Sequence, residues 1–340
     1  MFRRKRYRNK VMALFTILFC LCTLTLGYAT LSQDLTIEGT VEAVDAFSES
    51  TLINNALAKG DLVADTVSTN TSLAYTSKYY YKGSNPNNYI IFANKCFRIV
   101  NISQNDTMKI IYDGNVSSAG DCTTITTASG LINNQYRYNA LTDNLLSGVN
   151  NWFDTSEDAD SLRKTFEGFI NAGNVGGILL SNTNLNNMAN ATWYVGAVDV
   201  NSTQALASDI TNERTNKGSS SLPSLSEVGT NEYSYTGKVG LLNITDYVKA
   251  STNTSCSSVY TGTTTDVYCA SNNYLVKNYT MITMNPAGNS TDKIWAIKEN
   301  GQITYEQPVY KAVYVRPVFY LVSGLNFAGE GTVSNPYVIV

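Results

Sequence analysis

The sequence predicts an α+β fold, in which an N-terminal transmembrane or signal helix precedes a mainly antiparallel β domain with two or three helices in its middle. Three observations lead to this class. A basic flank precedes an uncharged apolar run, short β-branched and aromatic stretches recur along the chain, and longer helical patterns are concentrated in the middle. The 340 residues, 43% hydrophobic and 15% charged, suit one or two folded domains.

Residues 1–31 combine the basic flank with the apolar segment. Six Lys and Arg lie in residues 2–10, and the 18 residues of 11–28 carry no charge. A helix of that length spans roughly 27 Å, close to the hydrocarbon core of a bilayer. The flank predicts a cytoplasmic N-terminus and an extracellular remainder. The segment is either a retained anchor or a signal helix cut after Ala29.

Residues 32–72 are predicted to form a stalk or linker, followed by an extracellular α+β domain at 73–340. The linker contains a strand-like alternation and a short helix at 48–60, which Ser48 can cap and Gly60 can end.

A hairpin is expected at the start of the domain, with strands at 89–92, 96–100 and 107–112 and a turn at 103–106. Apolar spacing predicts helices at 140–152 and 156–172.

Asp154, Glu157, Asp158 and Asp160 fit the N-terminus of the second helix better than a calcium loop, which needs a turn glycine and a closing glutamate. The polar residues 211–231 mark a candidate internal boundary or an exposed loop.

Short strands are expected in the last third of the chain, and Pro317 marks a strand end, an edge or a bulge because it cannot donate a ladder hydrogen bond. The strands are predicted at 237–244, 259–260, 267–268, 279–284, 293–298, 302–305 and 312–322.

Four cysteines outside the apolar run predict structural disulfides: Cys96, Cys122, Cys256 and Cys269. No Cys-x-x-Cys pair is present, which argues against zinc ribbons and thioredoxin-like sites. Of the three connectivities, we expect the local one, Cys96–Cys122 with Cys256–Cys269. Such bonds agree with export, and four free buried thiols are the alternative.

The composition excludes several kinds of chemistry. The chain has no histidine, which removes Ser-His-Asp and Cys-His catalysis and His-ligated metals. Nucleophile-elbow, P-loop and Gly-x-Gly-x-x-Gly motifs are absent. Without the flank, 18 Lys and Arg face 27 Asp and Glu, a balance unsuited to nucleic acid. We therefore expect no catalytic residue, no cofactor, no metal and no nucleic-acid partner.

Some residue types leave a binding or hydrolytic role open. A hydrolase without a cofactor needs two carboxylates in a concave site. The candidates, which surface solvation explains equally well, are Glu227, Glu232, Asp246, Asp266 and Glu306. The 23 Tyr suit sugar or protein contacts as well as a half-exposed sheet. Arg98 and Arg316 lie in apolar strands and are expected to be paired for structural reasons.

Four stretches, taken in order, resemble segments of uncharacterised surface and exported proteins of low-GC Gram-positive bacteria and their wall-less relatives. The first ends a hydrophobic run with Gly-Tyr-Ala, the second contains Phe-Arg-Ile and Ile-Tyr-Asp-Gly, and the last runs from Val-Arg-Pro to Asn-Pro-Tyr. The stretches are residues 24–44, 79–114, 235–251 and 313–339.

The resemblance implies a C-terminal domain of unknown function, faintly C-type-lectin-like and formylglycine-generating-enzyme-like. This chain lacks the reactive cysteine pair of that enzyme branch and the Glu-Pro-Asn or Gln-Pro-Asp motif of calcium-dependent lectins. The group carries no activity that transfers to a residue here.

The expected function is that of a non-enzymatic bacterial cell-surface or secreted protein, with a binding or adhesion module for an extracellular protein or glycan. Its N-terminal helix gives the membrane contact, and its location is the cell membrane, or outside the cell after cleavage. Two alternatives stay open: a secreted carboxylate-type hydrolase without a cofactor, and an envelope or fibre subunit.

Overall fold

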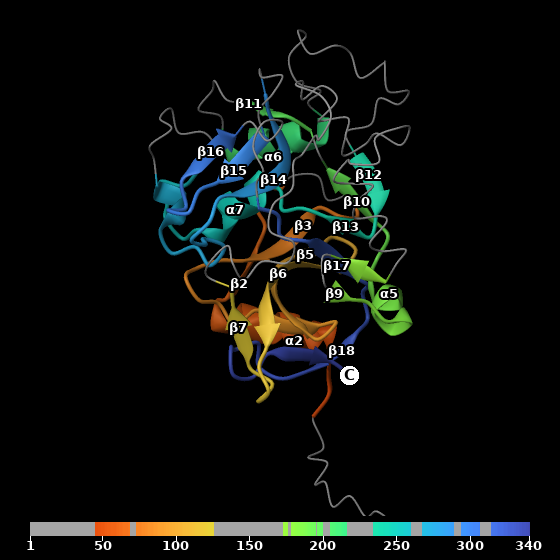
Figure 1. Ribbon diagram of the computed structural model, residues 1–340. Coiled ribbons are helices and arrows are strands. Elements are labelled where there is room, and N and C mark those ends of the chain that lie inside the picture. The colour runs from red at the N-terminus through yellow and green to blue at the C-terminus, as the bar shows by residue number, and fades with distance from the viewer. Residues whose placement is uncertain are drawn as a thin grey trace, which may run out of the picture. The chain divides into compact units, whose positions relative to one another are not determined.

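The computed structural model describes ten ranges of the chain, all within a compact unit that begins at Asp45. They are 45–68, 73–125, 173–175, 178–194, 196–199, 205–215, 234–259, 267–288, 294–306 and 314–340. These ranges form a mixed α+β fold of mainly antiparallel sheets with few helices, which confirms the predicted class at this level (Figure 1). The predicted N-terminal helix, the helices at 140–152 and 156–172 and most of the 211–231 loop lie outside the described residues.

The largest sheet grows from the predicted hairpin. β4 (Tyr89–Phe92) turns into β5 (Lys95–Ser103) through Ala93 and Asn94, both with positive φ, as a two-residue hairpin turn requires. β5 then pairs with β6 (Met108–Val116) over nearly its whole length. The three predicted strands of this region are thus confirmed.

The rest of this sheet comes from distant parts of the chain. Its main path runs β1-β18-β19-β4-β5-β6-β17-β13, and β3 joins β5 and β2 while β7 joins β6. The pairing of β19 with β4 is parallel, and the other pairings described in this sheet are antiparallel. The added strands are β1 (Phe47–Ser48), β2 (Leu62–Ala64), β3 (Ser77–Tyr81), β7 (Cys122–Thr124), β13 (Val239–Gly240), β17 (Val318–Leu321), β18 (Asn326–Ala328) and β19 (Tyr337–Ile339).

The segment predicted to belong to a stalk is in part folded into this sheet. β1 pairs with β18, and β2 pairs with β3. Between them, α2 (Glu49–Lys59) begins at the N-cap Ser48 and ends at Gly60 in the left-handed conformation, so the predicted helix is confirmed. Residues 45–64 therefore belong to the folded unit, which corrects the placing of the whole of 32–72 in a linker.

The smaller sheets gather the later strands with three short helices. A four-stranded sheet has the order β11-β14-β15-β16, and β10–β12 and β8–β9 form two-stranded pairs. The bounds are β8 (Asn174–Val175), β9 (Ile178–Leu179), β10 (Ala191–Tyr194), β11 (Val198–Asp199), β12 (Ser234–Gly237), β14 (Met281–Gly288), β15 (Ile294–Ile297), β16 (Ile303–Glu306), α5 (Asn182–Asn187), α6 (Leu206–Thr215) and α7 (Ile244–Ala250).

The strand predictions of the last third are partly right. Strands lie within or across 279–284, 293–298, 302–305 and 312–322, and Pro317 directly precedes β17. The prediction of one strand at 237–244 is wrong, because Asn243 caps α7 there. The prediction at 267–268 is wrong too, because Tyr268 opens the 3₁₀ turn η3 (Tyr268–Ala270) beside a disulfide. Val259 lies outside the described strands.

A continuous core of aromatic side chains joins these layers. Phe97 packs against Phe92, Tyr112 and Phe319 with ring centroids 5.5–5.9 Å apart, and Trp193 packs edge-on against Tyr320 at 4.8 Å. Burying such rings from four distant segments is a major stabilising term for the unit. None of the described helices is both long and apolar enough to cross a membrane.

Two disulfides each join cysteines that lie near each other in the sequence. Cys96 is bonded to Cys122, and Cys256 to Cys269, which is the local connectivity. The first connects β5 with β7, on either side of β6. Stable disulfides form in oxidising compartments, so these bonds indicate an extracellular location.

Gly240 in β13 gives a test of the core packing. A Cβ added there would lie 2.6 Å from Cδ2 and 2.7 Å from Cζ3 of Trp193, inside any normal contact distance. We expect Gly240→Ala to lower the free energy of unfolding by about 1–3 kcal/mol, measured by chemical denaturation of the oxidised protein.

A double-mutant cycle tests whether the Trp193 ring causes the loss of stability in Gly240→Ala. In a Trp193→Phe background the smaller ring leaves room, so Gly240→Ala should cost clearly less there. Equal costs in the two backgrounds would show that Trp193 is not the cause.

Candidate functional site

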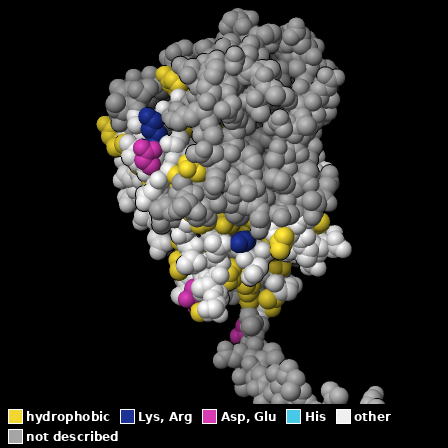
Figure 2. Space-filling view, viewed as in Figure 1, with side chains coloured by type: hydrophobic (Ala, Val, Ile, Leu, Met, Phe, Trp, Pro, Cys, Tyr) yellow, Lys and Arg dark blue, Asp and Glu magenta, His cyan; other side chains and the backbone are white. Residues whose placement is uncertain are grey.

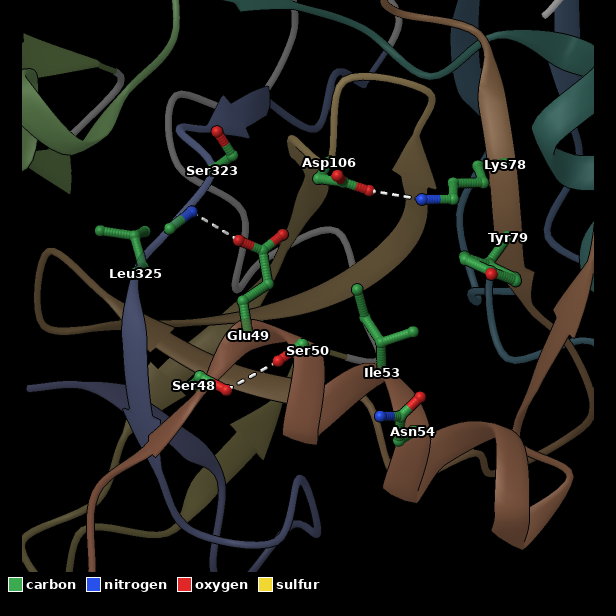
Figure 3. Close-up of a pocket in the computed structure, with 11 residues that line it drawn as sticks. Ser48, Glu49, Ser50, Ile53, Asn54, Lys78, Tyr79, Asp106, Ser323 and Leu325 are labelled. Carbon is green, nitrogen blue, oxygen red and sulfur yellow. Dashed lines mark hydrogen bonds and ion pairs between the residues drawn. The ribbon is translucent and has the colours of Figure 1, made fainter.

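A pocket of about 430 Å³ lies where the start of α2 meets β3, the β5–β6 turn and the loop before β18 (Figure 3). Four separate segments of the chain build it. The lining residues are Ser48, Glu49, Ser50, Ile53, Asn54, Lys78, Tyr79, Asp106, Ser323, Gly324 and Leu325. We call it the Glu49 pocket.

Glu49 is the buried acid of this pocket. Glu49 is the first residue of α2, and its Oε2 accepts a hydrogen bond from the backbone N–H of Gly324 at 2.6 Å. The residue is only 6% exposed, and Oε1 has no hydrogen-bond partner among the residues that the structure describes. A buried carboxylate oxygen without a donor is costly, and Oε1 is itself enclosed, so a ligand donor reaches it only after a side chain of the pocket moves.

Burial and a neighbouring acid raise the pKa of Glu49. Burial is the main cause, the N–H of Gly324 opposes it, and the charge of Asp106 adds to it. Figure 3 shows the carboxylate between the Ser323–Leu325 loop and the side of the pocket that holds Asp106. The group is therefore able to accept a hydrogen bond when ionised and to donate one when protonated.

Lys78 and Asp106 form the second polar feature of the Glu49 pocket. Nζ lies 2.8 Å from Oδ1, and the two side chains are 37% and 50% exposed. The hydrogen bond to Asp106 raises the pKa of Lys78. An ion pair this exposed contributes little to stability. Both groups can therefore exchange their mutual contact for contacts with a ligand.

The chemistry of the pocket suits a ligand rich in hydroxyl groups. Two carboxylates accept hydrogen bonds, one ammonium donates them, and Ser48 and Ser50, 2.8 Å apart through their hydroxyls, do both. Tyr79, Ile53 and Leu325 add aromatic and aliphatic surface. Convergent polar groups beside such surface are typical of small-molecule sites.

The carboxylates predicted for hydrolysis do not form this site. Glu227, Glu232 and Asp266 lie outside the described residues, and Glu306 ends β16. Asp246 is buried in α7 and paired with Lys109 at 2.6 Å. In the sequence, Glu49 looks like a first-turn helix charge and Asp106 like a turn residue. No local pattern could show that the loop before β18 brings them into one pocket.

The two predicted buried arginines are paired, as expected. Arg98 donates to Asn88 and stacks 3.7 Å from the ring centre of Tyr89. Arg316 donates to Asp113 at 2.6 Å, and Lys277 lies 2.7 Å from the same oxygen.

Burial lowers the pKa of Lys277 to about 8, against the opposing charge of Asp113. Burial alone would raise the pKa of Asp113, but Lys277 and Arg316 hold it below its usual value.

A second polar cluster lies at a small cavity between β6, α6 and α7. Lys109 and Asp246 form one buried ion pair there, and Lys249 forms another with Asp65 at 2.7 Å. Glu213 accepts from the backbone N–H and the hydroxyl of Thr245 at 3.1 and 2.6 Å. Burial raises the pKa of Glu213 to about 7, although the Thr245 bonds oppose the rise.

Glu213 gives the stability of the fold a defined pH dependence. Because its folded pKa of about 7 exceeds the ordinary 4.5, its stabilising contribution is complete below pH 4.5 and lost as the pH rises through 7. The full effect is about 3 kcal/mol. Glu213→Gln carries no charge and does not titrate. The unfolding free energy of the variant minus that of wild type should therefore rise by about 3 kcal/mol between about pH 4.5 and pH 8.

The control for this experiment is Glu330→Gln, at an exposed carboxylate far from the cluster in sequence. Its difference from wild type should stay flat over the same range. A flat difference for Glu213→Gln as well would contradict the raised pKa.

The outer surface and the comparisons complete the description. On the face seen in Figure 2, the described charged side chains are few, and one basic group lies next to an acidic one among neutral polar and hydrophobic groups. No group of three or more His, Cys, Asp or Glu in the described ranges is arranged to hold a metal ion. No protein-family model, no curated protein and no solved structure matches this chain.

Proposed function

We propose that this chain is a non-enzymatic bacterial cell-surface or secreted protein whose folded unit binds an extracellular glycan in the Glu49 pocket. The observation that carries the proposal is the buried carboxylate of Glu49, which has one oxygen bonded to Gly324 and the other without a donor among the described residues. On this proposal a sugar hydroxyl supplies the missing donor, without bringing a charge into the pocket, once a small side-chain movement uncovers the enclosed oxygen.

A neutral polyol fits the pocket better than an anion. Glu49 and Asp106 together outweigh the single cation Lys78, so an anionic ligand meets net repulsion. Neighbouring hydroxyls of a sugar ring can donate to the carboxylates and accept from Lys78. The C–H face of the ring can pack on Tyr79.

The proposed location rests on the disulfides, on the N-terminal segment and on the resemblance to bacterial surface proteins. The disulfides indicate an oxidising extracellular environment. The basic flank and the apolar run of residues 11–28 supply either a membrane anchor or an export signal. The resemblance to surface proteins of low-GC Gram-positive bacteria supports a bacterial envelope or its surroundings.

Glu49→Gln tests the assignment of the pocket. Gln keeps an acceptor for Gly324 but turns a donor, instead of an acceptor, toward the ligand. The oxidised chain from Ser32 onward is screened on a glycan array, and binding of a hit is then measured by calorimetry. We expect Glu49→Gln to weaken binding about tenfold or more, the loss of one hydrogen bond to a charged group.

Glu330→Gln is the matched control, because it makes the same change at an exposed position outside the pocket. It should bind as wild type does. Absence of any glycan binding by the folded wild type, or equal affinity of Glu49→Gln, would exclude the proposal.

A hydrolase is the second candidate, because one pocket holds a carboxyl group with a raised pKa and another carboxylate beside a cation. Glycosidases use such a pair as general acid and as base or nucleophile. Prolonged incubation of a bound glycan separates the two functions. New reducing ends that disappear with Glu49→Gln indicate an enzyme, and an intact glycan indicates a binding module.

A further inference from the structure

Lys109 lies in a buried contact with a side-chain amide and a carboxylate. Its Nζ is 2.9 Å from Oδ1 of Asn243 and 2.6 Å from Oδ2 of Asp246. The three residues are 2%, 7% and 7% exposed. The rings of Trp193 and Tyr320 each lie 5.6 Å from the ammonium group, so aromatic surface encloses the contact.

The orientation of the Asn243 amide is set by its other hydrogen bonds. Nδ2 donates to the backbone oxygen of Tyr194 at 2.7 Å and to Oδ1 of Asn285 at 3.3 Å. Both partners are acceptors, so the NH₂ end must face them and the carbonyl end must face Lys109. The carbonyl end of the amide, to which Cγ belongs, therefore faces the Lys109 nitrogen, with Oδ1 as the atom in contact.

Asp246 is equally well fixed. Its Oδ1 accepts from Nδ2 of Asn101 at 3.1 Å, which leaves Oδ2 to Lys109. Asn243 is the N-cap of α7 and Asp246 lies in its first turn, so one helix turn carries both partners of the lysine.

We propose that Lys109 and Asn243 react with each other to form an intramolecular isopeptide bond, with Asp246 as the proton carrier. Lys109 passes a proton to Asp246, and the neutral amine attacks Cγ of Asn243. The new C–N bond forms, the bond from Cγ to Nδ2 breaks, and Nδ2 leaves as ammonia after taking the second amine proton. The products are a secondary amide, ammonia and the protonated carboxyl group of Asp246.

Proximity and desolvation favour this step. The amine already contacts the carbonyl oxygen of the amide, which reduces the entropic cost of bringing the two groups together. The reaction also replaces a buried ion pair by a neutral amide and a neutral acid, so the desolvation cost of two charges is relieved.

Burial lowers the pKa of Lys109, but the charge of Asp246 outweighs this and raises it well above the usual value. The proton transfer to Asp246 must therefore come first, and the bond forms once per molecule as a slow maturation step.

The same chain offers two internal comparisons. Lys95 donates to Oδ1 of Asn115 at 2.7 Å, but this contact is exposed and no carboxylate contact is described for it. Lys277 is buried against Asp113, but Arg316 bonds to the same oxygen and holds that carboxylate in its unreactive anionic form. The combination of amine, amide, acid and enclosure is described only around Lys109.

Mass spectrometry of the full chain tests the proposal. The purified protein is reduced, alkylated and digested, so that processing elsewhere does not affect the result. We expect one cross-linked peptide joining Lys109 to Asn243, lighter by about 17 Da than its two parts because ammonia is lost. The peptides containing Lys95 and Asn115 should be unlinked in the same digest.

Two variants define the chemistry. Lys109→Arg keeps the charge but removes the amine nucleophile, and its digest should contain the Asn243 peptide free. Asp246→Asn should slow or abolish the bond while Lys109 and Asn243 remain.

Free Lys109 and Asn243 peptides from folded wild type would overturn the proposal, whether or not the variants fold. A bond from Lys109 to Asn101 instead of Asn243 would overturn the assignment of the amide.

Discussion

The burial of charge in the β5–β6 hairpin is the constraint on which the rest of the structure depends. Arg98, Lys109 and Asp113 are each 2% exposed within this hairpin, where an unpaired charge would cost several kcal/mol. Arg98 is held locally by Asn88, but the partners of the other two come from far along the chain: Asp113 meets Lys277 and Arg316, and Lys109 meets Asp246. The fold must therefore bring its last third against the hairpin before these charges are compensated.

Glu49 differs from the paired charges Lys109 and Asp113 and is informative for that reason. It is buried like the others, but its described contacts give it a backbone N–H and no paired cation. Lys78, the cation of the same pocket, is bonded to Asp106. Places where a structure leaves a polar group unsatisfied are those where function most often overrides stability. The Glu49 pocket meets that description.

Much of the local structure could be predicted, since its causes are local. Ser48 and Gly60 bound α2, and the turn clusters bound β4, β5 and β6, as the residue types alone indicate. The prediction of one strand at 237–244 is wrong because the sequence pattern alone cannot distinguish Asn243, a polar residue inside an apolar run, from an ordinary strand residue. Asn243 occupies the N-cap position of α7 without a side-chain cap hydrogen bond, and the backbone N–H of Ile244 donates instead to Asn285 in the distant strand β14.

The site could not be predicted, because it exists only through long-range pairing. The Glu49 pocket joins the start of α2 to β3, the turn at Asp106 and the loop at 323–325. Pairing of the two-residue strand β1 with β18 creates this meeting, and neither segment has a strong strand pattern of its own. The residue type alone makes Asp246 a candidate hydrolytic carboxylate, whereas in the structure Asp246 is paired with Lys109.

The same pairing connects the pocket to the N-terminal segment. The chain enters the folded unit at Asp45, two residues before β1, and Glu49 then bonds to Leu325 through its backbone and to Gly324 through its side chain. A ligand that contacts both Glu49 and the 323–325 loop would reinforce this junction.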